Sequence, residues 1–208
     1  MNKILPKYIV LLLVLAILLT GTFVVLAQEG GGFSDTFDDA TLPGWEHSQN
    51  VQVQDGALKI SPDNFAFRNG NWSNPDFSVK FRMSGSGGLV IHYHASDNGT
   101  YRINVISEQD HTEVNLEKEE NQQTTPLANS MDSNLNANDW NTIKIQFNNS
   151  QHTITLNDSQ IFQVQDDATL PGGSIGFFVF GESAIDTPRG HQRETIRDVY
   201  LVPHHSDD

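Results

Sequence analysis

The sequence predicts an all-β sandwich built from many short antiparallel strands. Residues 76–83 and 140–147 alternate apolar and polar side chains with a period of two, which is the pattern of strands that bury one face. Turn pairs such as Asp55-Gly56 and Asn69-Gly70 separate such segments. No segment after residue 27 keeps a helical period over three turns. Many short strands with closely spaced turns are typical of sandwiches and barrels.

These strands are expected to form one domain over residues 33–202. The chain has 208 residues, a length that all-β domains often use as a single unit. A glycine-rich linker is expected at residues 28–32 and a flexible tail at residues 203–208. Further strands are expected at 51–54, 57–60, 64–68, 87–95, 101–107, 112–118, 151–157, 160–165, 174–181 and 195–202.

The first 27 residues predict export from the cytoplasm. Lys3 and Lys7 are their only charged side chains, and an apolar run follows over residues 8–27, which predicts a hydrophobic helix. Cleavage after Ala27, as in a signal peptide, and retention as a membrane anchor both remain open. In either case the domain is expected outside the cytoplasm, secreted or held on the outer face of the membrane. Contact with the membrane is expected only through residues 8–27, if they are retained.

The composition narrows the range of partners. The formal net charge of −14 makes nucleic acid an unlikely partner, because binding to phosphates depends on positive charge. The chain has no cysteine, which excludes disulfides and a lipid attached at the cleavage site. The domain therefore depends on its core, with a metal ion as one source of further stability.

One seven-residue motif occurs twice, at residues 38–44 and 166–172. Both copies read Asp-Asp-Ala-Thr-Leu-Pro-Gly. The flanking strands do not match and no fixed period continues, so the repeat indicates reuse of one loop structure and not a duplicated domain.

Four stretches resemble one known family. They are Phe33–Phe37 with Leu42–Trp45 and Val53–Leu58, then Gly87–His94 with Asp97–Ile103, then Trp140–Ile145 with Ile154–Asn157 and Asp166–Gly176, and finally Ile196–Leu201. Together they resemble the concanavalin A-like lectin/glucanase superfamily, in particular laminin G-like modules and the 3-keto-disaccharide hydrolase family. The resemblance implies a two-sheet antiparallel jelly-roll sandwich. It says less about function, because this sandwich hosts lectins, hydrolases and adhesion modules.

A set of acidic residues is similar to a catalytic motif. Glu108, Asp110 and Glu113 have the Glu-x-Asp-x-x-Glu spacing of family 16 glycoside hydrolases, in which two carboxyl groups cleave the glycosidic bond. The residues between them are polar here, whereas those enzymes have mostly apolar ones. The segment also falls where two expected strands meet. We therefore expect a solvated hairpin turn.

Two histidines and an arginine are the first candidate ligand-binding residues. His92 and His94 lie two apart on an expected strand, so their side chains should share a face, and Arg102 follows on the partner strand. The register of the hairpin decides whether Arg102 joins that face, and the sequence leaves the register open. The resemblance implies a ligand groove on this sheet. A bound transition metal and an unspecialised face are the alternatives.

A tryptophan and two aspartates complete the candidates. Trp72 lies in a polar stretch, where an exposed indole could stack on a sugar, whereas Trp45 and Trp140 are expected to pack in the core or at an edge. The resemblance brings the two ends of the domain together. Asp35 and Asp198 could then hold a structural Ca²⁺ with backbone carbonyls.

The preferred function is an exported, non-catalytic module that binds a glycan or another cell-surface polysaccharide. One alternative is an enzyme acting on sugars, similar to a glycoside hydrolase, with Glu108, Glu113 or Glu182 as candidate carboxylates. A second alternative is a structural surface or assembly protein that makes contacts through sheet edges or loops.

Overall fold

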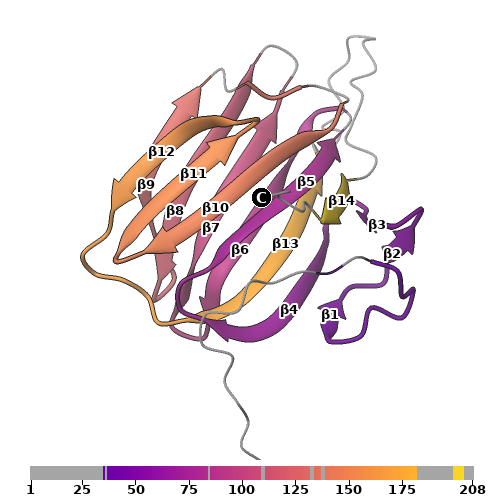
Figure 1. The fold of residues 1–208 in the computed structure, drawn as a ribbon, viewed down its shortest axis with the longest axis horizontal. Helices are drawn as coiled ribbons and strands as arrows, with labels where there is room; N and C mark the ends of the chain where they lie inside the picture. The colour runs from indigo at the N-terminus through magenta and orange to yellow at the C-terminus, as the bar shows by residue number, and fades with distance from the viewer. Residues whose placement is uncertain are drawn as a thin grey trace, which may run out of the picture.

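The computed structural model describes residues 35, 37–83, 85–108, 111–131, 134–136, 139–181 and 199–203. Two seven-stranded antiparallel sheets lie face to face (Figure 1). The described residues contain no helix, and therefore no helix that could span a membrane. The prediction of an all-β sandwich is confirmed. The predicted N-terminal helix, the linker and residues 204–208 of the predicted tail lie outside the described residues, while Pro203 ends the last strand.

We call the two sheets A and B. Sheet A consists, in spatial order, of β1 (Trp45–His47), β4 (Asn64–Trp72), β13 (Gly173–Gly181), β6 (Gly87–Ser96), β7 (Gly99–Ser107), β8 (Thr112–Glu120) and β9 (Gln123–Met131). Sheet B consists of β12 (Ser159–Gln165), β11 (Gln151–Leu156), β10 (Asn141–Asn148), β5 (Asp76–Met83), β14 (Val199–Pro203), β3 (Ala57–Ile60) and β2 (Val51–Gln54). The strands β6 to β9 and β10 to β12 follow one another in sequence order, whereas β13 brings a distant part of the chain between β4 and β6.

Most strands begin and end within one or two residues of their predicted positions. The sequence analysis missed β1 and β9, and β4 extends to Trp72 beyond the predicted end at residue 68. β9 is an edge strand with mostly exposed side chains, including Pro126, so its sequence lacks the alternation that marks the other strands.

The core lies between the two sheets and is formed by every second side chain of most strands. In β5, β7 and β10 the buried and partly exposed positions alternate strictly over most of the strand. Fully buried side chains such as Phe81, Ile103 and Ile145 each contribute about 1.5–3 kcal/mol through removal from water. Trp45 also belongs to this core, as expected, with its ring 5.9 Å from that of Phe177.

The two copies of the seven-residue motif bury the same leucine but bond the backbone through different aspartates, the second residue of the motif in the first copy and the first residue in the second copy. In the first, Asp39 accepts a hydrogen bond from the backbone N–H of Thr41 at 2.8 Å, and Leu42 is buried. In the second, Asp166 accepts one from the N–H of Ala168 at 3.0 Å, and Leu170 is buried. An aspartate that bonds the backbone two residues ahead stabilises a turn. The leucine of each copy anchors its loop to the core.

Removing a buried side chain should show how much the core contributes. Ile145→Ala should lower the free energy of unfolding by about 2–5 kcal/mol, because the fully buried isoleucine would leave a cavity. Urea unfolding of the purified chain would measure this. The neighbouring Gln146→Ala, which removes a partly exposed side chain from the opposite face, should change stability by less than about 1 kcal/mol. Equal losses in both variants would contradict this description of the core.

Candidate functional site

The face of sheet A that points away from sheet B carries the best candidate site, and we call it the outer face. Alternation along the strands sends one set of side chains into the core and the other set to this face. The outer set includes Phe65 and Phe67 of β4, Phe178 and Phe180 of β13, Val90 and His92 of β6, Arg102 and Asn104 of β7, and Glu113, Asn115, Glu117 and Glu119 of β8.

An aromatic half of the outer face covers β4, β13 and β6. Phe178 is the cross-strand partner of both Phe65 and Val90, and the rings of Phe65 and Phe67 have centroids 6.0 Å apart. Val90 is only 7% exposed although it does not belong to the core between the sheets. Apolar side chains therefore cover this part of the sheet from outside as well.

Two glycines set the position of the aromatic rings. A Cβ atom added to Gly176 would lie 2.3 Å from the ring of Phe67, and one added to Gly88 would lie 2.2 Å from the ring of Phe180. Both distances are far below van der Waals contact, so each ring lies directly over a strand position without a side chain. Glycine at such positions allows close approach to the sheet. The rings can thus lie low on the face and leave open space above them.

A polar half covers β7, β8 and β9. The guanidinium of Arg102 donates to Glu117 at 3.1 Å and to Thr124 at 3.0 Å, and its other terminal nitrogen lies 2.8 Å from Glu119. Asn104 donates to the same Glu117 oxygen at 2.9 Å. These partly exposed ion pairs contribute little stability, about 0–1 kcal/mol each, but they fix the orientation of the side chains.

His92 lies at the boundary between the two halves, opposite Arg102 in the register of β6 and β7. Its ring centroid is 5.2 Å from that of Phe67. Burial, and to a lesser extent the charge of Arg102, lower the pKa of His92 to about 4. The imidazole is therefore neutral at pH 7. Its Nδ1 lies 3.3 Å from the hydroxyl of Thr100, which leaves Nε2 for a ligand. The register also settles the question left open by the sequence, because His92 and Arg102 share the outer face.

The expectation that His94 shares this face is wrong. The pairing of β6 with β7 shifts register between Tyr93 and Ser96, and His94 has a positive φ of 53°. This bulge turns its side chain into the core, where it is 1% exposed and its Nδ1 donates to the carbonyl of Leu170 at 3.1 Å. His94 is a structural residue and cannot contact a ligand on the outer face.

A buried polar cluster surrounds His94 and escaped the sequence analysis. Tyr93 and His152 are bonded through the hydroxyl and Nδ1 at 2.7 Å, and the hydroxyl of Tyr101 donates to Asp166 at 2.7 Å. Lys118 lies 3.3 Å from Asp166 and also donates to the carbonyl of Ala168. The sequence does hold a signal for two members, since Lys118 and His152 occupy positions of alternating strands that are otherwise apolar and buried.

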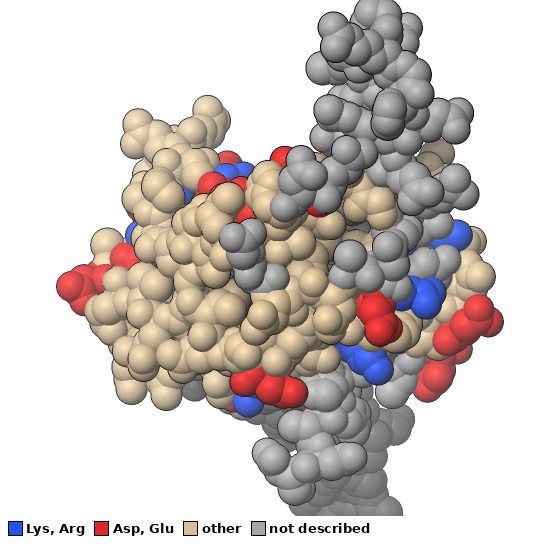
Figure 2. Space-filling model, turned by 90° about the horizontal axis from the view of Figure 1, so that it is seen from above, with Lys and Arg blue, Asp and Glu red and all other residues tan. Residues whose placement is uncertain are grey.

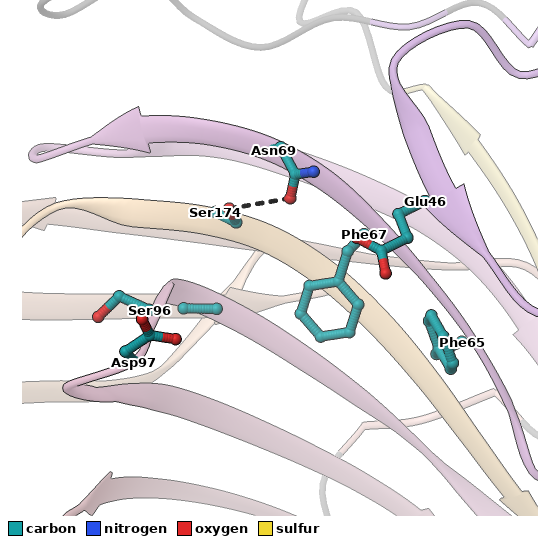
Figure 3. Close-up of a pocket in the computed structure, with 8 residues that line it drawn as sticks. Glu46, Phe65, Phe67, Asn69, Ser96, Asp97 and Ser174 are labelled. Atoms are coloured by element: carbon teal, nitrogen blue, oxygen red, sulfur yellow. Dashed lines mark hydrogen bonds between the residues drawn. The ribbon is translucent and has the colours of Figure 1, made fainter.

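A shallow pocket of about 440 Å³ opens at one end of the aromatic half (Figure 3). Its lining residues come from β1, β4, β13, the end of β6 and the turn after it: Glu46, Phe65, Phe67, Asn69, Ala95, Ser96, Asp97 and Ser174. Figure 3 shows the ring of Phe67 between Glu46 on one side and Asp97 on the other. The pocket combines flat apolar rings with carboxylate, amide and hydroxyl groups.

The remaining candidate residues lie elsewhere. Trp72 is partly buried, packs against the core and does not line the pocket. The two carboxylate oxygens of Asp35 accept hydrogen bonds from the N–H of Phe37 at 2.9 Å and from the indole of Trp45 at 2.7 Å. Asp198, the other expected calcium ligand, lies outside the described residues. Within the described ranges, no group of three or more His, Asp or Glu side chains could hold a metal ion.

The acidic motif lies where two strands turn, as expected. Glu108 follows β7, its side chain is 51% exposed, and its backbone N–H donates to the carbonyl of His111 at 2.9 Å. Glu113 belongs to β8, on the outer face, and accepts a hydrogen bond from Asn129. Asp110 lies outside the described residues, and so does Glu182.

The buried cluster makes stability depend on pH. Burial lowers the pKa of His152 to about 4, so between pH 6.5 and 4 the unfolded chain binds a proton that the folded chain does not. Stability should therefore fall as the pH drops through this window, by up to about 3 kcal/mol for His152. His152→Gln keeps a hydrogen-bonding group for Tyr93 but cannot titrate. Urea unfolding at pH 7 and 4.5 should show a smaller loss for this variant, and an unchanged loss would contradict the assignment.

Comparisons with known proteins identify solved structures that share this fold. No curated protein matches in sequence. The described fold resembles a Bacillus subtilis carbohydrate-binding module, CBM66, with a TM-score of 0.55 and 14% identity over 83% of this chain and 97% of that chain. It also resembles a Bacillus licheniformis β-glucanase, with a TM-score of 0.60 and 11% identity over 85% and 100%.

A third similar structure is a family 16 glycoside hydrolase of Bacteroides ovatus, with a TM-score of 0.61 and 8% identity over 81% of this chain and 97% of that chain. At these identities the likenesses establish the jelly-roll fold alone. The family model of the 3-keto-alpha-glucoside-1,2-lyase-like domain matches residues 32–185. The resemblance found in the sequence is thereby confirmed, and the chain belongs to the family of 3-keto-alpha-glucoside-1,2-lyase-like domains.

Proposed function

We propose that this protein is an exported, non-catalytic module that binds a glycan on the outer face of sheet A. The observation that carries the proposal is the pairing of an aromatic half with a polar half on one open sheet face. Carbohydrate-binding and glycan-acting proteins both occur among the similar structures, so the fold alone does not separate binding from catalysis.

The chemistry of the face suits a sugar. Pyranose and furanose rings have apolar C–H faces that can lie on the phenyl rings of Phe65 and Phe67, and hydroxyl groups that need donors and acceptors. The neutral imidazole of His92 and the amide of Asn69 offer both kinds of group beside those rings. Ligand sites are commonly apolar clefts with a few well-placed polar groups, and this face has that composition.

The state of the carboxylates favours binding over catalysis. Glu117 is held by both Arg102 and Asn104, and Glu119 by Arg102, so these carboxylates already have partners within the sheet. A general acid must instead direct its carboxyl group at the substrate atom that it protonates. Export rests on the first 27 residues alone, whose basic and apolar segments suit a signal peptide or an anchor on the outer face of the membrane.

The family's description favours a second candidate, an enzyme that acts on sugars. A lyase that removes a proton next to a carbonyl needs a base, and the outer face offers the neutral imidazole of His92 for that role, a weak base at its lowered pKa of about 4. If glycoside turnover is detected, His92→Gln should reduce kcat at least about 100-fold. Unchanged turnover in this variant would remove His92 as the base, and loss of turnover in the exposed-turn variant Glu108→Gln would point to the acidic motif instead.

Binding to a glycan array tests the proposed function. The full-length chain should bind at least one class of glycan, and Phe67→Ala should weaken that binding about 5- to 100-fold, because a central aromatic contact commonly contributes about 1–3 kcal/mol. Trp140→Ala is the matched control, since Trp140 stacks near Lys80 and Arg82 of sheet B. Affinity measured by titration calorimetry should not change in this control. No binding to any glycan would overturn the proposal.

A further inference from the structure

The pocket at the end of the aromatic half is lined by negatively charged side chains without a positively charged one. Two carboxylates, Glu46 and Asp97, line it beside two phenyl rings, and no lysine, arginine or histidine does. Both acids are exposed, and neither has a hydrogen bond or ion pair with another side chain of the described residues. Their negative charge is therefore available to a ligand, subject to screening by solvent and salt.

The rest of the outer face adds to this negative potential. Glu113, Glu117 and Glu119 line β8, and Arg102 is the only guanidinium or ammonium group that the described outer face presents. Arg102 already bonds Glu117, Glu119 and Thr124 through its terminal nitrogens. His92 is neutral at pH 7. A uronic acid or a sulfated sugar would thus find no free cation here.

The surface charges are not arranged this way everywhere. Figure 2 shows one face of the molecule on which acidic and basic side chains occur in small scattered groups of both signs. On sheet B, Lys144 lies 3.7 Å from Asp76, and Lys80 and Arg82 lie over the ring of Trp140. On sheet B acids and cations thus lie close together, whereas the pocket on the outer face is lined by carboxylates without a cation.

We propose that the pocket lined by Glu46, Phe67 and Asp97 binds the ammonium group of a 2-amino sugar within a glycan. This inference rests on the proposed function, since it names the ligand class of the same face. The sugar ring would lie on Phe65 or Phe67. Its protonated amine would meet the ring face by a cation–π contact and the two carboxylates by charge-assisted hydrogen bonds.

The affinities of four pentasaccharides distinguish the possible classes of ligand. Titration calorimetry of the full-length chain would compare glucosamine, N-acetylglucosamine and glucose pentasaccharides with a galacturonic acid pentasaccharide. The glucosamine ligand should bind about tenfold more tightly than the uncharged ligands, because an exposed charge pair contributes a factor of up to about five and a cation–π contact adds to it. The galacturonic acid ligand should bind most weakly.

Salt and matched variants identify the source of the preference. At 0.5 M NaCl the advantage of glucosamine should shrink toward twofold, because salt screens exposed charges. Glu46→Gln with Asp97→Asn should remove the advantage, so that the glucosamine and glucose ligands bind this variant with equal affinity. The control, Asp55→Asn with Asp158→Asn, removes the same charge from exposed turns of sheet B and should keep the advantage.

Equal or tighter binding of the uncharged ligands would overturn this inference while the proposed function stood. Preference for the galacturonic acid ligand would overturn it too, as would an advantage of glucosamine that survives in the Glu46→Gln, Asp97→Asn variant. Absence of binding to all four ligands and to the wider glycan array would instead remove the proposed function itself.

Discussion

The bulge at His94 is the constraint on which the outer face depends. A left-handed φ of 53° at a residue other than glycine costs about 1–2 kcal/mol, so the surrounding structure must stabilise it. The imidazole does so by entering the core, where its ring centroid is 4.8 Å from that of Phe147 and its Nδ1 donates to Leu170. That hydrogen bond holds the loop 166–172, which leads directly into β13. At its other end the bulge redirects β6, so that the residues after it, Ser96 and Asp97, form one side of the pocket. One backbone distortion therefore links the core to the candidate site.

The second organising feature is that sheet A has apolar side chains on both faces. Its inner face belongs to the core, and its outer face carries the phenyl rings that bury Val90. These rings are partly exposed, and a contiguous apolar patch on a protein surface commonly marks a binding site. Gly88 and Gly176 support this interpretation. Glycine weakens a strand, and it often marks a position that another group approaches closely. Here the rings of Phe180 and Phe67 make that approach. At these two positions the sheet thus gives up strand stability and gains close packing of the phenyl rings over its outer face.

The sequence predicted the strands well because alternation is a local signal, and it predicted the site poorly because side-chain direction depends on distant pairing. β5 and β10 follow their patterns to the residue or nearly so. β9 could not be found, since an exposed edge strand needs no apolar alternation. The sequence predicts that His92 and His94 share one face of the sheet. The bulge at His94 interrupts the alternation of side chains along β6, so that His92 lies on the outer face and His94 in the core. The contacts of His152 and Asp166 with β6 and β7 join residues more than fifty positions apart in the sequence. A local sequence pattern cannot predict such contacts.

The same alternation that builds the sheets also separates the charges of the chain. Along β8 the inward positions end in Lys118, whose ammonium is neutralised by Asp166 beneath the sheet, while the outward positions carry the glutamates. A cation on the inner side of a strand cannot pair with the carboxylates on the outer side. Arg102 is the one cation on the described outer face that pairs with Glu117 and Glu119, and both of its terminal nitrogens are used for these carboxylates. The acids at the pocket, which lie across the aromatic rings from Arg102, are left to meet solvent or a ligand. The distribution of charge over the outer face therefore follows from which side of each strand a charged residue occupies, and the ligand preference that we propose rests on this distribution.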